Sequence, residues 1–390
     1  MDLIIIILFF CCCCCCIILS GGGYFYITNT SNTSEQASKT STLSPNISGQ
    51  SSSDNSQITT IKPTTTTPIP VIKWVICGNN TTQMPTIAYS YNGKLWEQVK
   101  SIISIPGMFN SVAYNGNMWV AVGQARTFII ATSTDGIIWK LNDFSNQYNG
   151  SGQSICWTGS MWIAVGYTTQ PATGWAIASI VTSIDGLNWS RIYNSNNGNT
   201  YFSSVAYNPS IKTLVASGGN STAYSKDGIN WTSINSSAIT DNGIMQITII
   251  NSQFVAAVMS NQANLINSTD GITWNRYNNT ISGNVMSNPN KIILFKNIMI
   301  IGGFGAFQTG YSSDQGKTWT GSLTSFNSLN ITNSIATYNS DIVLAVGYDR
   351  KTKENTTLGQ VLTSTDGINW SSNNISFMLQ IQSIASNIPL

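Results

Sequence analysis

A short motif of the form Ser-X-Asp-Gly-X-X-Trp recurs along this chain and constrains the fold more than any other feature. Its seven tryptophans are separated by 43, 50, 42, 43, 45 and 51 residues. Internal repeats with periods of about 20–50 residues are typical of solenoids, propellers and related arrays. The copies of the motif are residues 90–96, 133–139, 183–189, 225–231, 268–274, 312–319 and 364–370.

Each copy has the chemistry of a tight hairpin turn. Glycine adopts φ > 0 without steric cost, and the Asp and Ser side chains can accept hydrogen bonds from N–H groups of the same turn. The Trp supplies a large apolar surface for packing against the next unit. We therefore assign structural roles to the motif residues, namely Asn92, Asp135, Asp185, Asp227, Asp270, Asp314 and Asp366 in the turns, and Trp96, Trp139, Trp189, Trp231, Trp274, Trp319 and Trp370 in the packing.

The sequence upstream of each motif repeats as well. In one unit, residues 111–115 (SVAYN) precede 119–123 (WVAVG) and 129–132 (IIAT), and a short fourth strand follows the motif. Short apolar or alternating strands separated by Gly, Asn and Asp turns are typical of β-propeller blades. No segment of the repeat region shows a 3.6-residue apolar period, so no helix is required there. The sequence therefore predicts an all-β fold built from four-stranded blades.

The two ends of the repeat region predict how the ring closes. Residues 74–78 (WVICG) align with the second strand of the other units, so the first blade lacks its first strand. Residues 382–387 (QSIASN) match residues 110–115 (NSVAYN) and can supply that strand. This closure would pair both open sheet edges. We predict a seven-bladed β-propeller over residues 71–390, closed by its C-terminal strand.

The motifs resemble the Asp-box repeats of bacterial neuraminidases and other sialidases. The cadence of residues 119–123 (WVAVG) and 132–139 (TSTDGIIW) is also similar to the propellers of the photosystem II stability and assembly factor family. The resemblance covers residues 71–390 and implies a propeller. It implies no activity, because Asp-boxes occur on many non-enzymatic propellers and lie, in sialidases, on the rim away from the active site.

Residues 1–27 contain an apolar run with the length of a membrane segment. Residues 3–19 are an uninterrupted series of Ile, Leu, Phe and Cys, and a Gly- and aromatic-rich segment follows. A membrane helix needs about 17–25 residues, and aromatic residues suit the membrane interface. We expect an uncleaved signal-anchor, and a cleaved signal peptide with a secreted propeller is the alternative. Six consecutive cysteines, residues 11–16, are either small apolar side chains in lipid or S-acylation sites.

Residues 28–70 are expected to form a disordered stalk. The segment has no aromatic residue and is dominated by Ser, Thr, Asn and Gln, so it cannot bury enough apolar surface to offset its ordering entropy. With the anchor, it indicates a propeller displayed extracellularly, in a lumen or on a virion surface. N-glycosylation sequons agree with this location. A chain that is rich in Asn, Ser and Thr also produces such sequons by chance. The candidate acceptors are Asn29, Asn32, Asn46, Asn80, Asn149, Asn220, Asn235, Asn278, Asn330, Asn355 and Asn374.

The composition excludes several classes of site. The chain has no histidine, which excludes His-ligated metals and His-containing catalytic triads. Charged residues make up only 8% of the chain and the net charge is +2, so no electrostatic footprint for nucleic acid is present. We expect no cofactor, no metal and a monomeric propeller. Cys77 and Cys156 fall on the predicted inner strands of two blades and should be free, buried thiols.

The predicted binding site lies on the face opposite the motifs. If the motifs join the third and fourth strands, that face is built from loops between the second and third strands and from connections between blades. Two of these loops, residues 167–175 and 348–359, are long and account for the steps of 50 and 51 residues. Binding residues concentrate in long loops on rigid scaffolds. The candidates are Arg126, Trp175, Asp349, Arg350 and Glu354.

We do not expect sialidase activity, and we assign no catalytic residue. Sialidases use a Tyr nucleophile beside a carboxylate, and the resemblance implies three arginines that hold the substrate carboxylate. The chain has four arginines, and two of them, Arg191 and Arg276, directly follow motif strands, which should place them far from the opposite face. Besides Asp349 and Glu354, only Asp143 and Asp241 supply off-motif carboxylates to that face.

Three hypotheses for the function follow. The leading one is a membrane-anchored, non-catalytic propeller that binds a protein or glycan partner outside the membrane. A degenerate sialidase-like glycoside hydrolase or lectin is the first alternative. An assembly factor for a membrane complex is the second, and it follows only from the resemblance to the photosystem II family. Sialic acid binding would require arginines that converge on one pocket, whereas protein binding would show as a broad aromatic patch.

Overall fold

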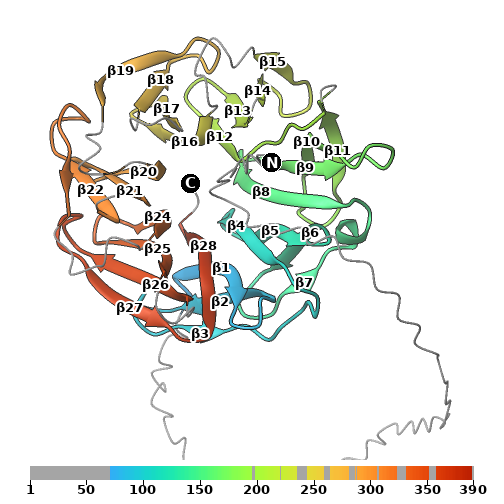
Figure 1. Cartoon of the computed structure of the whole chain (residues 1–390), viewed down its shortest axis with the longest axis horizontal. Coiled ribbons are helices and arrows are strands. Elements are labelled where there is room, and N and C mark those ends of the chain that lie inside the picture. The colour runs from blue at the N-terminus through green and yellow to red at the C-terminus, as the bar shows by residue number, and fades with distance from the viewer. Residues whose placement is uncertain are drawn as a thin grey trace, which may run out of the picture. The chain divides into compact units, whose positions relative to one another are not determined.

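The computed structural model describes residues 71–195, 198–219, 221–234, 244–258, 264–280, 286, 288–304, 307–322, 331–350 and 357–388, all within the compact unit Thr67–Leu390. These residues form seven four-stranded antiparallel sheets arranged as the blades of a propeller (Figure 1). The predicted seven-bladed fold is therefore confirmed. The predicted anchor and stalk lie outside the described residues. Within the described ranges, no helix has the length and apolarity needed to span a membrane.

Each blade runs from an inner strand at the centre of the ring to an outer strand. Blade one consists of β28 (Met378–Ser386), β1 (Trp74–Asn80), β2 (Pro85–Ser90) and β3 (Glu97–Gln98). One 3-10 turn, η1 (Asp143–Asn146), lies between blades two and three. Blades two to seven are formed in chain order by β4 (Met108–Tyr114), β5 (Trp119–Ala125), β6 (Thr127–Ser133) and β7 (Lys140–Leu141); β8 (Gly150–Trp157), β9 (Trp162–Thr169), β10 (Ala176–Ser183) and β11 (Ser190–Asn194); β12 (Ser204–Asn208), β13 (Thr213–Gly218), β14 (Ser221–Ser225) and β15 (Thr232–Ile234); β16 (Ile244–Ile250), β17 (Gln253–Val258), β18 (Asn264–Ser268) and β19 (Asn275–Thr280); β20 (Asn288–Phe295), β21 (Ile298–Phe304), β22 (Thr309–Ser312) and β23 (Thr320–Gly321); β24 (Ile331–Tyr338), β25 (Ile342–Arg350), β26 (Thr357–Ser364) and β27 (Ser371–Ile375).

The C-terminal strand closes the ring as the sequence predicted. β28 pairs antiparallel with β1, with Trp74 opposite Ser386 and Ile76 opposite Ile384. Figure 1 shows β28, in red, beside the blue β1. The inner strands contact one another in the order β28, β4, β8, β12, β16, β20, β24 and again β28. No inner strand of the ring therefore lacks a neighbour on either side.

The motif turns have the expected local structure. In blade two, Ser133 Oγ donates to Asp135 Oδ1 at 2.9 Å, and the N–H groups of Ile137 and Ile138 both donate to that oxygen at 2.8 Å. Gly136 adopts a φ of 76°, and every other motif glycine also lies in the left-handed region. In blade one, Asn92 Oδ1 accepts the same two backbone hydrogen bonds, at 2.8 and 2.9 Å. Turn chemistry thus accounts for the motif residues.

Each motif tryptophan packs at a junction between two blades. Trp139 of blade two lies in an apolar cluster with Ile72, Val75 and Ile87 of blade one. Seven such clusters occur, one at each junction, and each contains one motif tryptophan. The sequence predicted that each tryptophan packs against the next blade, and this prediction is wrong. The sheet face that carries the tryptophan faces the preceding blade.

Amide side chains on the inner strands link successive blades. Six of the seven inner strands carry a β-bulge at an equivalent position. The amides of Asn110, Asn290 and Asn333 donate from these bulges to backbone carbonyls of the following blade, at 2.8, 3.1 and 2.9 Å. In three blades, a serine hydroxyl also accepts a hydrogen bond from a backbone N–H of the following blade. Ser154 and Ser383 directly follow a bulge, and Ser204 occupies the same place in blade four.

The two cysteines of the propeller each differ from expectation in one respect, Cys77 in its strand and Cys156 in its burial. Both are free thiols. Cys77 is buried, and burial raises the pKa of its thiol. It lies on β1, the second strand of its blade, because β28 occupies the inner position. Cys156 does lie on an inner strand, β8, but it is half-buried rather than buried.

Candidate functional site

The propeller has two faces with different loops. The turns of the seven motifs lie on one side of the ring, together with the turns between the first and second strands of each blade, and we name this side the motif face. The loops between second and third strands and the connections between blades form the opposite face. The predicted binding residues belong to the opposite face.

The structure places the described members of the predicted binding set in three blades of the opposite face. Arg126 occupies the turn between β5 and β6 with a φ of 66° and an exposed side chain. Trp175 precedes β10 in blade three. Asp349 and Arg350 end β25 in blade seven, their side chains are not described, and Glu354 lies outside the described residues. Blade one therefore lies between the blade that carries Asp349 and Arg350 and the blade that carries Arg126.

Trp175 is held by a compact loop and remains 58% exposed. The N–H of Gly174 donates to the Gln170 carbonyl at 2.8 Å, and the N–H of Gln170 donates to the Trp175 carbonyl at 2.9 Å. The ring lies so close to Gly198 that a Cβ there would be 2.0 Å from it. An exposed indole on a fixed loop can serve as a contact residue, and this prediction remains untested.

Arg191 reaches the opposite face, contrary to expectation. Its Nη1 donates to Thr168 Oγ1 at 3.2 Å, and its guanidinium lies 4.1 Å from the centre of the Tyr148 ring. Thr168 is near the end of β9, and Tyr148 lies in the connection between blades two and three. The long side chain therefore runs from its motif strand toward the opposite face and bridges two blades. Arg276, at the same place in blade five, is exposed and stays at the motif face.

The described glycosylation candidates are distributed over the opposite face and the outer strands. Asn80 ends β1, and its Oδ1 accepts hydrogen bonds from the Thr82 and Met84 N–H groups at 3.0 Å. Asn149 lies in the connection before β8, and Asn374 lies on the outer strand β27. The backbone of Asn278 lies on the outer strand β19, whereas the candidates outside the described residues are Asn29, Asn32, Asn46, Asn220, Asn235, Asn330 and Asn355.

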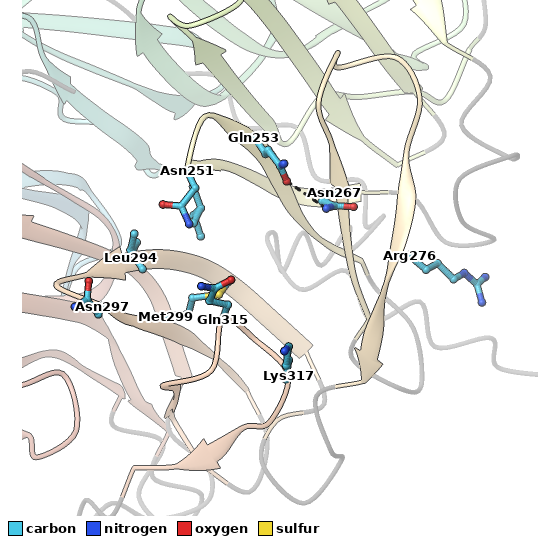
Figure 2. Close-up of a pocket in the computed structure, with 10 residues that line it drawn as sticks. Asn251, Gln253, Asn267, Arg276, Leu294, Asn297, Met299, Gln315 and Lys317 are labelled. Atoms are coloured by element: carbon cyan, nitrogen blue, oxygen red, sulfur yellow. Dashed lines mark hydrogen bonds between the residues drawn. The ribbon is translucent and has the colours of Figure 1, made fainter.

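A pocket lies on the motif face at the junction of blades five and six (Figure 2). Its volume is about 690 Å³. Ile250 and Met299 are buried and form its apolar base, and Leu294 is 38% exposed at its side. The sequence does not predict this pocket, because residues from strands and turns about 65 positions apart must meet to form it. The remaining lining residues are Asn251, Gln253, Asn267, Arg276, Asn297, Gln315 and Lys317.

The pocket wall is rich in amides and contains no carboxylate among its ten lining residues. Asn267 donates its side-chain amide to Gln253 Oε1 at 3.4 Å, which leaves the Gln253 amide N–H groups free to donate elsewhere. Figure 2 shows Lys317 pointing toward the space between blades, whereas Arg276 points away from the other lining side chains. The wall therefore offers neutral donors and acceptors and one ammonium group, and neither a nucleophile nor a general base.

The motif of blade six differs from the other copies where it lines the pocket. It contains one extra residue, Gln315, between Asp314 and Gly316. Gln315 has a φ of 62°, which costs a residue other than glycine roughly 1–2 kcal/mol. Asp314 keeps its role, because the hydroxyl and N–H of Thr318 donate to it at 2.7 and 2.8 Å and lower its pKa to about 2. The insertion thus adds an amide to the pocket without removing the turn.

Comparisons with known proteins show no family for this chain. No family model matches the chain, and no curated protein matches it. A chain of a nidogen/laminin complex is 9% identical with a TM-score of 0.46, covering 81% of this chain and 98% of that one. YCF48 from Cyanidioschyzon merolae is 15% identical with a TM-score of 0.47, covering 71% and 94%. The computationally designed Ika8 protein is 10% identical with a TM-score of 0.42, covering 74% and 80%. At these values the likenesses do not extend to a ligand or a partner.

Proposed function

We propose that this protein is a non-catalytic binding propeller, tethered to a membrane by residues 3–19, that takes a saccharide in the pocket between blades five and six. The observation that carries the proposal is the amide-rich wall of that pocket over an apolar base. The seven motifs, which resemble Asp-boxes, add support from a class of propellers that includes glycan-processing proteins. The extracellular or lumenal location proposed from the sequence would expose the pocket to glycans.

The chemistry of the pocket matches a sugar better than it matches a purely apolar or a strongly charged ligand. Sugar hydroxyls both donate and accept hydrogen bonds, and side-chain amides do the same. The C–H face of a pyranose ring can pack on Met299 and Leu294. The volume of about 690 Å³ lies within the range of roughly 300–1,000 Å³ typical of small-molecule sites. The Lys317 ammonium would favour a saccharide that carries a carboxylate or sulfate.

A glycan array tests the proposal with purified residues 71–390. We expect selective binding by the wild-type propeller, and binding weakened roughly tenfold or more, by loss of one or two hydrogen bonds, in Gln253→Leu and in a variant lacking Gln315. Removing Gln315 restores the motif length found in the other six copies, so the variant should fold. Lys317→Ile should weaken binding of acidic glycans more than of neutral ones.

Lys94→Ile is the matched control for Lys317→Ile. Lys94 occupies the same motif position in blade one, far from the pocket, so its replacement should leave glycan binding unchanged. Absence of binding by a folded wild-type propeller, or equal binding by the pocket variants, would contradict the proposal. Turnover of a fluorogenic sialoside by the same protein would instead support the alternative of a divergent hydrolase.

A protein partner on the opposite face is the second candidate function. The observation that favours it is the 58% exposed Trp175 on its fixed loop. Tryptophan and arginine are enriched among residues that dominate protein–protein binding energies, and Arg126 lies in the neighbouring blade on the same face. Partner capture with wild-type protein and Trp175→Ala, identified by mass spectrometry, would show whether a specific partner depends on this indole.

A further inference from the structure

The motif face carries most of the exposed apolar side chains of the described propeller. Of twelve large hydrophobic residues that are exposed, seven belong to motif turns of blades one to five. Leu95 and Ile184 are both 75% exposed, Ile138 is 68% exposed, and Ile229 and Ile272 are 55% and 40% exposed. Single exposed aliphatic residues are normal on a soluble protein, but their concentration on one side is characteristic of an interaction surface.

The fold does not require these aliphatic residues. The turn is fixed by the Asp, Ser and Gly of the motif, and Ile137 and Ile138 contribute to it only through their backbone N–H groups. Polar residues occupy the position of Leu95 and Ile138 in other copies, as Asn188 does in blade three. The hydrogen-bonded turns therefore present the aliphatic side chains outward from a rigid base.

Lysines share the motif face with the aliphatic residues. Of the nine lysines within the described ranges, seven lie there, and Lys94, Lys226 and Lys317 are in the motifs themselves. The motif aspartates on the same face direct Oδ1 inward to the N–H groups of their own turns, as Asp135 does. Carboxylates and lysines are nearly equal in number on this face, so net charge is not its distinguishing property. The distinguishing property of this face is the set of exposed aliphatic side chains that stand between the lysines. We name them the aliphatic tips: Leu95, Ile137, Ile138, Ile184, Leu187, Ile229 and Ile272.

The polypeptide enters the propeller at this same face. The N–H of Lys73 donates to the carbonyl of Ser90, the first residue of the blade-one motif, at 3.1 Å. The side chain of Ile72 lies against Gly136 in the motif of blade two. Val71, one residue earlier, is 68% exposed. The predicted membrane segment and stalk are therefore joined to the propeller on the side that carries the aliphatic tips.

We propose that the motif face docks on a lipid bilayer, with the aliphatic tips of blades one to five in the interface and the lysines among the headgroups. Amphipathic surfaces bind bilayers through buried apolar area supplemented by attraction to anionic lipids. The tether would raise the local concentration of the bilayer at this face. This inference does not depend on the saccharide proposed for the pocket, which lies at the junction of blades five and six.

Vesicle sedimentation with residues 71–390 tests the proposal without the predicted membrane segment. This part forms a complete ring, because all seven sheets lie between Trp74 and Ser386. The probes are vesicles of phosphatidylcholine alone and of phosphatidylcholine mixed with phosphatidylserine. We expect the propeller to sediment with both, more strongly with the second, and to remain partly bound at high salt. A triple variant with Leu95→Asn, Ile138→Asn and Ile184→Thr should bind vesicles at least about tenfold more weakly than the wild type. Its melting temperature should be unchanged.

Trp175→Ser is the matched control, because it removes an exposed apolar side chain from the opposite face. It should leave vesicle binding unchanged. The proposal is overturned if the wild-type propeller binds neither kind of vesicle, if Trp175→Ser weakens binding as much as the triple variant, or if binding disappears at high salt. A dimer that the triple variant dissociates, seen by sedimentation velocity without vesicle binding, would assign the surface to a second copy of the chain. The variant lacking Gln315 should leave sedimentation unchanged, because Gln315 lines the pocket and is neither a lysine nor an aliphatic residue, so this experiment and the glycan array can fail separately.

Discussion

The side-chain amide of Asn333 donates a hydrogen bond of 2.9 Å to the backbone carbonyl of Ile381. Asn333 is the bulged residue on the inner strand of blade seven, and Ile381 belongs to the C-terminal strand that completes blade one. A side chain of one blade thus fixes the strand that closes the ring. Equivalent bonds from Asn110 and Asn290 link other neighbouring blades.

Replacing Asn333 by alanine should destabilise the propeller by roughly 1–2 kcal/mol, because a carbonyl at the closure loses its donor. Chemical denaturation of residues 71–390 measures the change. Asn117→Ala is the control, since Asn117 is exposed and its side chain makes no described hydrogen bond. Equal stability of Asn333→Ala and wild type would show that the closure does not depend on this bond.

Removing residues 378–390 should cost far more than any single substitution. β28 supplies the inner strand of blade one and contacts the inner strands of blades two and seven. Its loss would expose the edge of β1 and apolar side chains that pack in the same cluster, among them Ile76, Val346 and Val361. We expect a protein that melts at a much lower temperature or aggregates, as measured by calorimetry and size-exclusion chromatography. An unchanged melting temperature is the contrary outcome.

Arg191→Ala should destabilise the protein, whereas Arg276→Ala should not. The two arginines occupy the same place after their motifs, but Arg191 covers the Tyr148 ring and donates to Thr168, and Arg276 is exposed. Loss of a cation–π contact and a charged hydrogen bond predicts a change of roughly 1–3 kcal/mol for Arg191→Ala. Similar free energies of unfolding for the two variants would refute this difference between blades.

Lys291→Ser should stabilise the propeller by roughly 0.5–2 kcal/mol at neutral pH. Lys291 follows the bulge of β20, where other blades have serines such as Ser154 and Ser383, and burial lowers its pKa to about 8. Because the folded-state pKa is below the ordinary value of 10.5, the wild type gains stability as pH rises from about 8 to 10.5. The advantage of the variant should therefore shrink over that window in denaturation experiments. An advantage that is absent at neutral pH, or constant across the window, contradicts the prediction.

Asp135→Asn should reduce the loss of stability in acid. Burial acts to raise the pKa of Asp135, but hydrogen bonds from the Ile138 and Ile137 N–H groups and the Ser133 hydroxyl outweigh it and lower the pKa. The carboxylate thus contributes stability above the ordinary Asp pKa of about 3.9, and this contribution is lost as pH falls through the lower folded-state value. Asn92 shows that an asparagine can make the same turn. The difference in unfolding free energy between wild type and variant should be largest at neutral pH and should shrink as the pH falls below ~4. A difference that does not change with pH would refute the assignment.

The amide and hydroxyl links between blades were visible in the sequence but not understood. Asn or Gln followed by Ser recurs at residues 110–111, 153–154, 333–334 and 382–383. Spacing alone does not distinguish a surface pair from a bulge at the centre of a ring. The meaning of the pair depends on which blade it faces, and that is a property of the assembled propeller.

The sequence by itself determined the blade repeat, the turn made by each motif and the closure by residues 382–387, because these features depend on local backbone chemistry and on strand pairing that repeats in phase. Only the tertiary structure decided that the motif tryptophans face the preceding blade, that Arg191 crosses to Tyr148, and that Gln253 and Gln315 line one pocket. Each of these relationships joins residues of different blades. Their geometry is set by how twisted sheets pack around a common axis, which no spacing within a single repeat encodes.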